Sequence, residues 1–150
     1  MTTATVEAPI DIFSIEAHRG PVTSLYKHLR TLDRGEMATV FICSPYTSEL
    51  GDADEVRQNR EKAIYYCKKA FDQGKIPFCS HLLYPQILDD SDPKDRALGI
   101  YAGIKFMQLC DEIWIFLPDG MLPTKGMRIE MNIAKNLKMK RVVITDPEVL

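Results

Sequence analysis

The sequence predicts an α/β fold with a doubly wound parallel sheet of four to five strands and helices on both faces. From residue 38 onward, short runs of β-branched and aromatic residues alternate with long segments of helical periodicity. The short runs are almost continuously apolar, as are strands that are buried on both faces of a parallel sheet. The length of 150 residues and the hydrophobic content of 45% suit one ordinary globular domain.

The first two expected strands enclose a long helix. Residues 38–43 (ATVFIC) form the first strand. Apolar residues three and four positions apart predict a helix over residues 54–73, which Gly74 ends. Residues 76–80 form a second, short strand whose proline suits a strand start or an edge, and a loop over residues 81–92 follows.

The rest of the chain repeats this alternation twice. Asp92 and Pro93 suit the N-cap and the first position of a second helix. Its expected apolar stripe comprises Ala97, Ile100, Ile104 and Met107. Residues 112–117 (EIWIFL) form the strongest expected strand, before a helix over residues 125–137 and a last strand over residues 141–144. Right-handed crossovers between parallel strands then give a Rossmann-like or flavodoxin-like topology.

Residues 1–37 do not follow this alternation and form an N-terminal extension, so the expected main domain covers residues 38–150. Within the extension, residues 10–15 have the composition of a further strand. A short helix is predicted from the spacing of Val22, Leu25, Tyr26 and Leu29. We therefore expect the extension to be a strand–helix unit or an arm.

Charge and composition exclude several classes of protein. The 19 Lys and Arg residues against 21 Asp and Glu residues leave a net charge of −2, which offers no basic field to nucleic acid or an anionic membrane. The longest apolar runs, such as residues 113–117, fall far short of the roughly 20 residues that span a bilayer. No export signal is visible, and the four cysteines form no C-x-x-C pair. These features predict a reduced, cytoplasmic protein that binds neither nucleic acid nor membrane.

The carboxyl ends of parallel strands meet at one edge of the sheet, where ligands bind. This edge is expected to bring together residues 44–48, the loop after residue 80, residues 118–125 and the start of the last helix. It carries neither G-x-G-x-x-G nor the phosphate-binding pattern G-x-x-x-x-G-K-[ST], and no cluster has metal-ligand spacing. We therefore expect no cofactor and no metal there.

Glu130 is the most informative polar residue at this edge. It lies three and four positions before Ile133 and Ala134, so it shares their inward-facing side of the helix. An inward carboxylate beside a crevice is costly unless it has a partner or a function. The alternative is a structural Glu that interacts with the positive end of the helix dipole. The pattern favours the functional interpretation.

The segments VFICSPYTS, IPFCSHLLYPQ, CDEIWIF and KGMRIEMNIA, with Asn59 in the first helix, resemble the nucleoside 2-deoxyribosyltransferase-like superfamily, in a branch found in bacteria and phages. The resemblance covers roughly residues 38–144. Its most specific part is the pattern G-M-x-x-E with Ala four positions later: Gly126, Met127, Glu130 and Ala134.

What this resemblance implies is a catalytic role for Glu130, because the Glu of the motif is the nucleophile or the oxocarbenium stabiliser in the characterised enzymes. It also implies a sugar pocket lined by Ser44, Pro45 and Tyr46. A carboxylate suits such chemistry, since loss of a nucleobase leaves positive charge on the anomeric carbon. Relatives are commonly oligomers, so the resemblance further implies a homo-oligomer.

A second group must protonate or hydrogen-bond the departing base. Some nucleotide-hydrolysing relatives carry an acid about two turns before the Asp of the C-D-E strand, and this chain has Gly103 there. By loop position, the substitutes are Asp92, Asp95 and Asp119. The expected catalytic set is Glu130, Tyr46 and Asp119.

The remaining expected ligand contacts each have a structural alternative. His81 can donate to a phosphate or a base, or serve as a structural histidine. Arg96 can bind a phosphate, or pair with Asp92 or Asp95. Asn59 can point into the cleft or lie on a solvated helix face. The residues expected to contact the substrate are Ser44, Pro45, Asn59, His81, Asp89, Asp90, Arg96, Gly126 and Met127.

Together these inferences favour an enzyme that cleaves or exchanges the N-glycosidic bond of a nucleoside or nucleotide. It would be a deoxyribosyltransferase or an N-glycoside hydrolase with a carboxylate nucleophile. The alternative is a non-catalytic nucleotide-binding or sensing module on the same fold. A structural protein that assembles through its N-terminal arm is a third hypothesis. The expected partner of the enzyme or the sensor is a small nucleoside or nucleotide.

Overall fold

The computed structural model of the chain describes residues 23–32, 37–47 and 50–150. It divides the chain into two units, residues 1–36 and 37–150, and each is described by itself. In the first unit, helix α1 covers Thr23–Leu32, in agreement with the helical spacing in the sequence. The strand expected at residues 10–15 lies outside the described residues.

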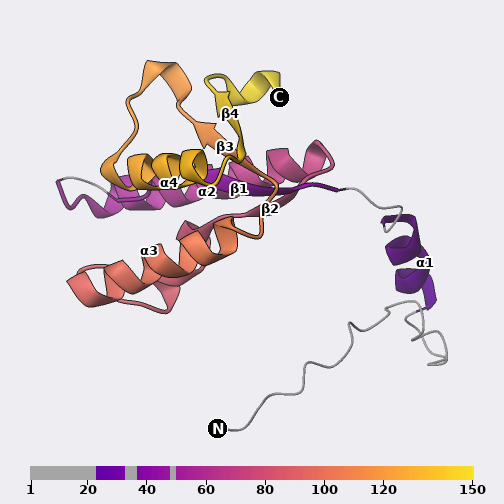
Figure 1. Ribbon diagram of the computed structural model, residues 1–150, viewed down its shortest axis with the longest axis horizontal. Helices are drawn as coiled ribbons and strands as arrows, with labels where there is room; N and C mark the ends of the chain where they lie inside the picture. The colour runs from indigo at the N-terminus through magenta and orange to yellow at the C-terminus, as the bar shows by residue number, and fades with distance from the viewer. Residues whose placement is uncertain (1–22, 33–36, 48–49) are drawn as a thin grey trace, which may run out of the picture. The chain divides into compact units, whose positions relative to one another are not determined.

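The second unit is built on a parallel sheet. Among the described residues the sheet has four strands, in the order β2-β1-β3-β4 (Figure 1). The strands are β1 Thr39–Cys43, β2 Ile76–Phe78, β3 Glu112–Phe116 and β4 Lys140–Ile144. All pairings are parallel, and Val40 of β1 lies opposite Pro77 of β2 and Glu112 of β3. The chain builds the sheet in one direction from β1 to β2 and in the other from β3 to β4, which confirms the α/β parallel fold and places the topological switch point between β1 and β3.

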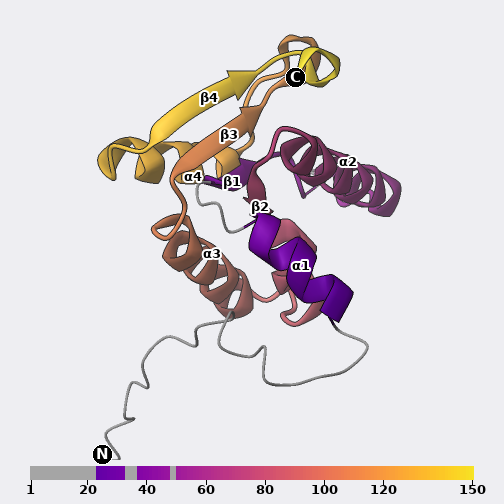
Figure 2. The ribbon, with the colours of Figure 1, turned by 90° about the vertical axis from the view of Figure 1, so that its right-hand side faces the viewer.

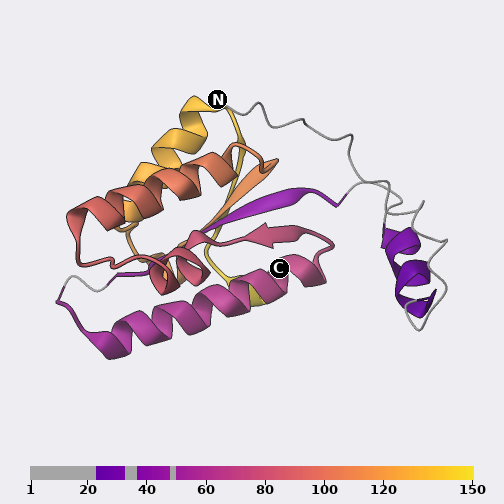
Figure 3. The ribbon, with the colours of Figure 1, turned by 90° about the horizontal axis from the view of Figure 1, so that it is seen from below.

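Three helices cover the two faces of this sheet. They are α2 Ala53–Asp72, α3 Pro93–Met107 and α4 Lys125–Asn136. Figures 2 and 3 show α2 on one face, and α3 and α4 on the other. The core follows the alternation of the strands: Val40 and Ile42 pack on the α2 side, whereas Phe41 and Cys43 pack on the α3–α4 side.

Side-chain caps set the beginnings of these helices. The Asp92 side chain accepts a hydrogen bond of 3.0 Å from the Lys94 backbone N–H, and Pro93 occupies the first turn, as the sequence predicts. The Thr124 hydroxyl accepts from the Met127 N–H at 3.2 Å and so fixes the start of α4. Gly74, just after α2, has a φ of +70°, a left-handed conformation that favours glycine.

The structure corrects two details of the sequence-based prediction. Strand β2 ends at Phe78 instead of residue 80, because the chain turns into a short 3₁₀ helix at Ser80–Leu82 and a second one at Tyr84–Gln86. Ala97, expected in the apolar stripe of α3, is exposed. The residues that α3 buries are Gly103 and Met107, because the helix packs closely on the turn after β2.

Across the described ranges, no helix has both the length and the apolar content required to cross a membrane.

Candidate functional site

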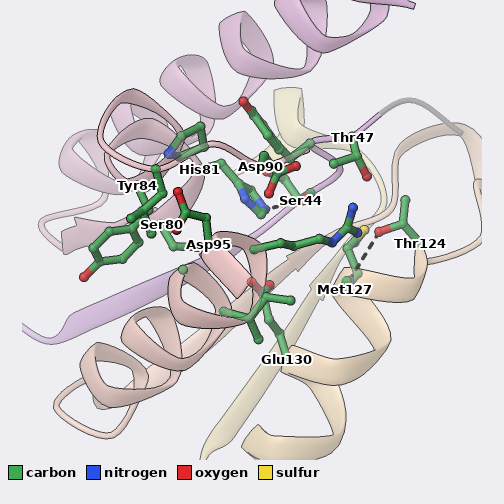
Figure 4. A pocket seen from close by; sticks show the side chains of 17 residues that line it. Ser44, Thr47, Ser80, His81, Tyr84, Asp90, Asp95, Thr124, Met127 and Glu130 are labelled. Carbon is green, nitrogen blue, oxygen red and sulfur yellow. Dashed lines mark hydrogen bonds between the residues drawn. The ribbon is translucent and has the colours of Figure 1, made fainter. Parts of the chain in front are cut away.

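A pocket opens at the carboxyl end of β1, beside the switch point of the sheet, where ligands bind in open α/β folds (Figure 4). Its volume of about 80 Å³ has room for several water molecules or a small part of a ligand. Five segments line it: the chain after β1, the two 3₁₀ turns after β2, the loop that follows them, the first half of α3 and the first half of α4 with the residue before it. The polar lining residues are Ser44, Tyr46, Thr47, Ser80, His81, Tyr84, Asp90, Asp95, Arg96, Thr124 and Glu130.

Glu130 lies on the α4 wall of this pocket, on the same side of the helix as the buried Met127 and Ala134. The residue is half-buried, but its Oε2 atom is fully buried and has no hydrogen-bond partner. Burial raises the pKa of the Glu130 carboxyl from 4.5 to about 8, and a hydrogen bond with the Cys43 thiol opposes that rise. The carboxyl is therefore mostly protonated at neutral pH.

Ser44 and Tyr46 line the pocket from the chain after β1, and His81 holds this segment. His81 Nε2 donates to the Ser44 carbonyl oxygen at 2.9 Å, and the His81 ring stacks on the Tyr46 ring with centroids 5.1 Å apart. Burial lowers the pKa of His81 to about 4, so the imidazole is neutral. Because a carbonyl only accepts, Nε2 carries the proton and Nδ1 is left as an acceptor.

Ser44 supplies a second polar atom without a partner. Ser44 is buried, and its Oγ has no hydrogen-bond partner in the structure. Ser44 Oγ and Glu130 Oε2 are the two buried side-chain atoms in the described residues that lack a partner, and both belong to residues that line the pocket. Buried polar groups are almost always satisfied, so this pair indicates a place where a ligand or water completes the hydrogen bonds.

Asn59 supports the pocket without lining it. It is buried on α2, where its Nδ2 donates to the Tyr46 carbonyl oxygen at 3.2 Å. Pro45 also stands outside the lining, between two residues whose carbonyls are held by His81 and Asn59. Asn59 and His81 therefore fix the backbone of the loop after β1 from two sides.

The mouth of the pocket carries opposite charges. Asp90, Asp95 and Arg96 all line it, and the Asp95 Oδ2 accepts from the Asp89 backbone N–H at 2.9 Å. Asp89 is exposed and stands outside the lining; bonds from the Ser91 hydroxyl and N–H lower the pKa of its carboxyl. Among the described residues no ion pair joins Arg96 to Asp92 or Asp95, so its guanidinium is available to a ligand.

Two positions considered for the second catalytic group lie elsewhere. Asp119 is exposed in the turn after β3, has a left-handed φ of 55° and does not line the pocket. Its charge helps to raise the pKa of Tyr66, which belongs to the core on the α2 side. A Cβ on Gly103 would lie 3.3 Å from the Ser80 Cβ, so a larger side chain at that position would require the neighbouring turn to shift.

The structure thus brings together most of the ligand contacts expected from the sequence: Ser44, Tyr46, His81, Asp90, Arg96, Gly126, Met127 and Glu130. Thr47, Ser80, Tyr84 and Thr124 also line the pocket; they lie in the segments expected at this edge but were not predicted as individual ligand contacts. Thr124 carried a signal, since a Thr before a helical segment suits an N-cap. Within the described residues, no group of three or more His, Cys, Asp or Glu side chains could hold a metal ion.

Comparison with known families places this domain. Residues 38–144 match the family described as a domain of unknown function, DUF7768. The chain belongs to this family. A search of curated protein sequences finds no match.

Among solved structures, the fold is similar to that of a 2-deoxyribosyltransferase from the psychrotolerant bacterium Bacillus psychrosaccharolyticus. The TM-score is 0.53 and the sequence identity 15%, over 72% of each chain. At this identity the likeness concerns the fold alone. It agrees with the resemblance inferred from the sequence at that level.

Proposed function

We propose that this protein cleaves or exchanges the N-glycosidic bond of a nucleoside or nucleotide, with the Glu130 carboxylate acting on the anomeric carbon. The observation that carries the proposal is the buried, unpartnered Oε2 of Glu130 on the wall of a pocket at the switch point. The fold shared with a 2-deoxyribosyltransferase, and the G-M-x-x-E pattern of the sequence, support the same assignment.

In this reaction the bond from the anomeric carbon to the base nitrogen breaks, and its electron pair leaves with the base. The positive charge that develops on the sugar is stabilised by the Glu130 carboxylate, which can also bond to it covalently. Water or a second base then attacks the sugar and completes hydrolysis or exchange. Because the pKa of Glu130 is about 8, the reactive carboxylate is a minority form at neutral pH and becomes dominant above pH 8.

Other lining residues suit the remaining tasks of this proposal. The departing base takes up a proton, which solvent water can deliver where Asp90 and Asp95 line the pocket. Ser44 Oγ, which has no partner in the protein, suits a sugar hydroxyl, as does the Tyr46 hydroxyl. Asp119 has no part in the proposal, because it does not line the pocket.

The test is nucleobase release from a panel of nucleosides and nucleotides, measured by chromatography. Glu130→Gln removes the carboxylate with little change of volume, and we expect it to lower release by about 1000-fold. Glu61→Gln, an exposed change on α2, is the matched control and should keep the wild-type rate. Equal release by wild type and Glu130→Gln would refute the proposal.

A nucleotide-binding or sensing module is the second candidate, and the protonated state of Glu130 at neutral pH favours it. A neutral carboxyl can donate and accept hydrogen bonds, which suits binding of a ligand without reaction. Calorimetry with the same panel separates the two. A nucleotide that binds tightly and is recovered intact over the pH range would support the sensor and count against the enzyme.

A further inference from the structure

Cys43, a neighbour of Glu130, is the last residue of β1 and is completely buried on the α3–α4 side of the sheet. It directly precedes Ser44, so it lies beneath the wall of the pocket. Its Sγ is 3.9 Å from the Met127 carbonyl oxygen, and its thiol is also within hydrogen-bonding reach of the Glu130 carboxyl. One S–H group therefore has two acceptors on the same helix α4.

Several other groups surround Glu130, among them the unpartnered Ser44 hydroxyl and Arg96, which line the same pocket. Cys79, which follows β2, is near enough for its thiol to sense the Glu130 charge. His81 is neutral, and the charged or titratable groups that share the pocket are Tyr46, Tyr84, Asp90, Asp95 and Arg96. No Lys or Arg in the described part of the chain forms an ion pair with Glu130. Among the groups around Glu130, the Cys43 thiol is near enough to lower the pKa of the carboxyl, although burial raises that pKa more strongly.

We propose that Cys43 is a positioning residue for Glu130: its thiol donates to the Met127 carbonyl while Glu130 is protonated, and to the Glu130 carboxylate once that group is ionised. This inference depends on the proposed function only in giving the Glu130 carboxylate a catalytic use. The hydrogen-bond exchange itself requires no substrate.

Physical reasons favour this role over simple packing. A buried carboxylate that forms no ion pair needs donors, and the Cys43 thiol can supply one from the core side of the pocket. Burial and the Glu130 charge raise the pKa of the Cys43 thiol well above its ordinary value, so it keeps its proton and is not a nucleophile. Because S–H is a weak donor, it orients the carboxylate without holding it permanently ionised.

The decisive experiment follows the pKa of Glu130 by carbon NMR of labelled Glu carboxyls, with its signal assigned by its loss in Glu130→Gln. Cys43→Ser supplies a stronger donor and should lower the midpoint by about 0.5 pH unit. Cys43→Ala removes the donor and should raise it by about the same amount. Cys110→Ala, a change outside the pocket, is the control and should leave the midpoint in place. A common midpoint in all variants, or a lower one in Cys43→Ala, would overturn the proposal.

A second measurement needs no change at residue 43 and so does not depend on the folding of those variants. The S–H stretching band of the wild type should move to lower frequency as the pH is raised through about 8, because the thiol turns to the stronger acceptor. The same movement should be absent in Glu130→Gln. An unchanged band in the wild type would contradict the exchange.

Both measurements are made without substrate, so they separate the two proposals. If no nucleobase is released but the midpoints follow the expected order, Cys43 positions a carboxyl whose task is binding. If nucleobase is released but the midpoints coincide, the enzyme stands and the role of Cys43 falls.

Discussion

Two buried carboxyls, at opposite edges of the same sheet, differ in how they are satisfied. Glu112 lies at the amino end of β3 and is 5% exposed. Its Oε1 accepts from Trp114 Nε1 at 2.9 Å, and Lys75 and Lys140 place their Nζ atoms 3.6 and 3.5 Å from its oxygens. Glu130, near the carboxyl end of β1, has a buried oxygen with no hydrogen-bond partner, and no Lys or Arg of the described residues forms an ion pair with it.

The difference separates a structural role from a functional one. The indole N–H of Trp114 and the ammonium groups of Lys75 and Lys140 interact with Glu112 and offset the unfavourable free energy of its burial. The buried Oε2 of Glu130 has no such partner in the protein. A buried polar atom that the fold does not satisfy is therefore the better guide to function, and the following changes test that contrast.

The largest effect on stability is expected for Glu130→Gln at high pH. The folded pKa of about 8 lies above the unfolded value of 4.5, so the native state keeps a proton that the unfolded state has lost between these values. The wild type should lose up to about 4 kcal/mol as the pH rises through this window, and Glu130→Gln should not. Urea unfolding at about pH 5 and about pH 9 measures the difference in unfolding free energy between the wild type and the variant. A difference of the same size at both pH values would contradict the account.

Glu112→Ala should have the next largest effect, a loss of about 3 kcal/mol at neutral pH. It removes the acceptor of the buried Trp114 N–H and leaves the half-buried Lys75 unpaired. Lys140→Ala is the control, since Lys140 is 69% exposed and its removal should cost less than about 1 kcal/mol. Chemical unfolding measures the free energy of unfolding of both variants. An equal decrease in both would show that the interactions of Glu112 stabilise the fold no more than those of a surface residue.

Asn59→Ala tests a partnered polar group that supports the pocket. The variant leaves the Tyr46 carbonyl without its donor, which should cost about 1 kcal/mol of stability. Asn132→Ala, an exposed change on α4, should be nearly neutral. A stability as high as that of the wild type would mean that the Asn59 hydrogen bond does not hold the loop.

Ser44→Ala should have the smallest effect on stability, below about 0.5 kcal/mol, because the Ser44 hydroxyl has no partner to lose. Its effect should instead fall on ligand affinity, with a loss of about tenfold if the hydroxyl binds a sugar oxygen. Thermal unfolding and calorimetry measure the two quantities. A Ser44→Ala variant that loses stability but keeps its ligand affinity would show that the Ser44 hydroxyl has a structural role, like the side chains of Glu112 and Asn59.

Local sequence features predicted most of the fold. The apolar run that became β1, the N-cap Asp92 with Pro93, and the end of α2 at Gly74 depend on neighbours in the chain, so short patterns reveal them. The inward-facing position of Glu130 could also be predicted, because helical spacing alone places it beside Ala134.

Features that depend on packing between distant segments could not be predicted from the sequence. The rotation of α3, which exposes Ala97 and buries Gly103 against Ser80, follows from the way the turn after β2 folds. The contact of Cys43 with Glu130 joins residues 87 positions apart, across a strand and a helix. The placement of Asp119 on the far side of the strand from Glu130 likewise depends on the left-handed turn after β3.

The pH dependence of nucleobase release, measured as kcat/KM for the wild type beside Glu130→Gln, tests the central claim most directly. The account predicts that the rate of the wild type rises with pH to a plateau, with a midpoint of about 8, as the Glu130 carboxylate forms. Glu130→Gln should lose both the rise and nearly all of the activity. A wild-type rate that does not change with pH, or a variant as active as the wild type, would contradict it.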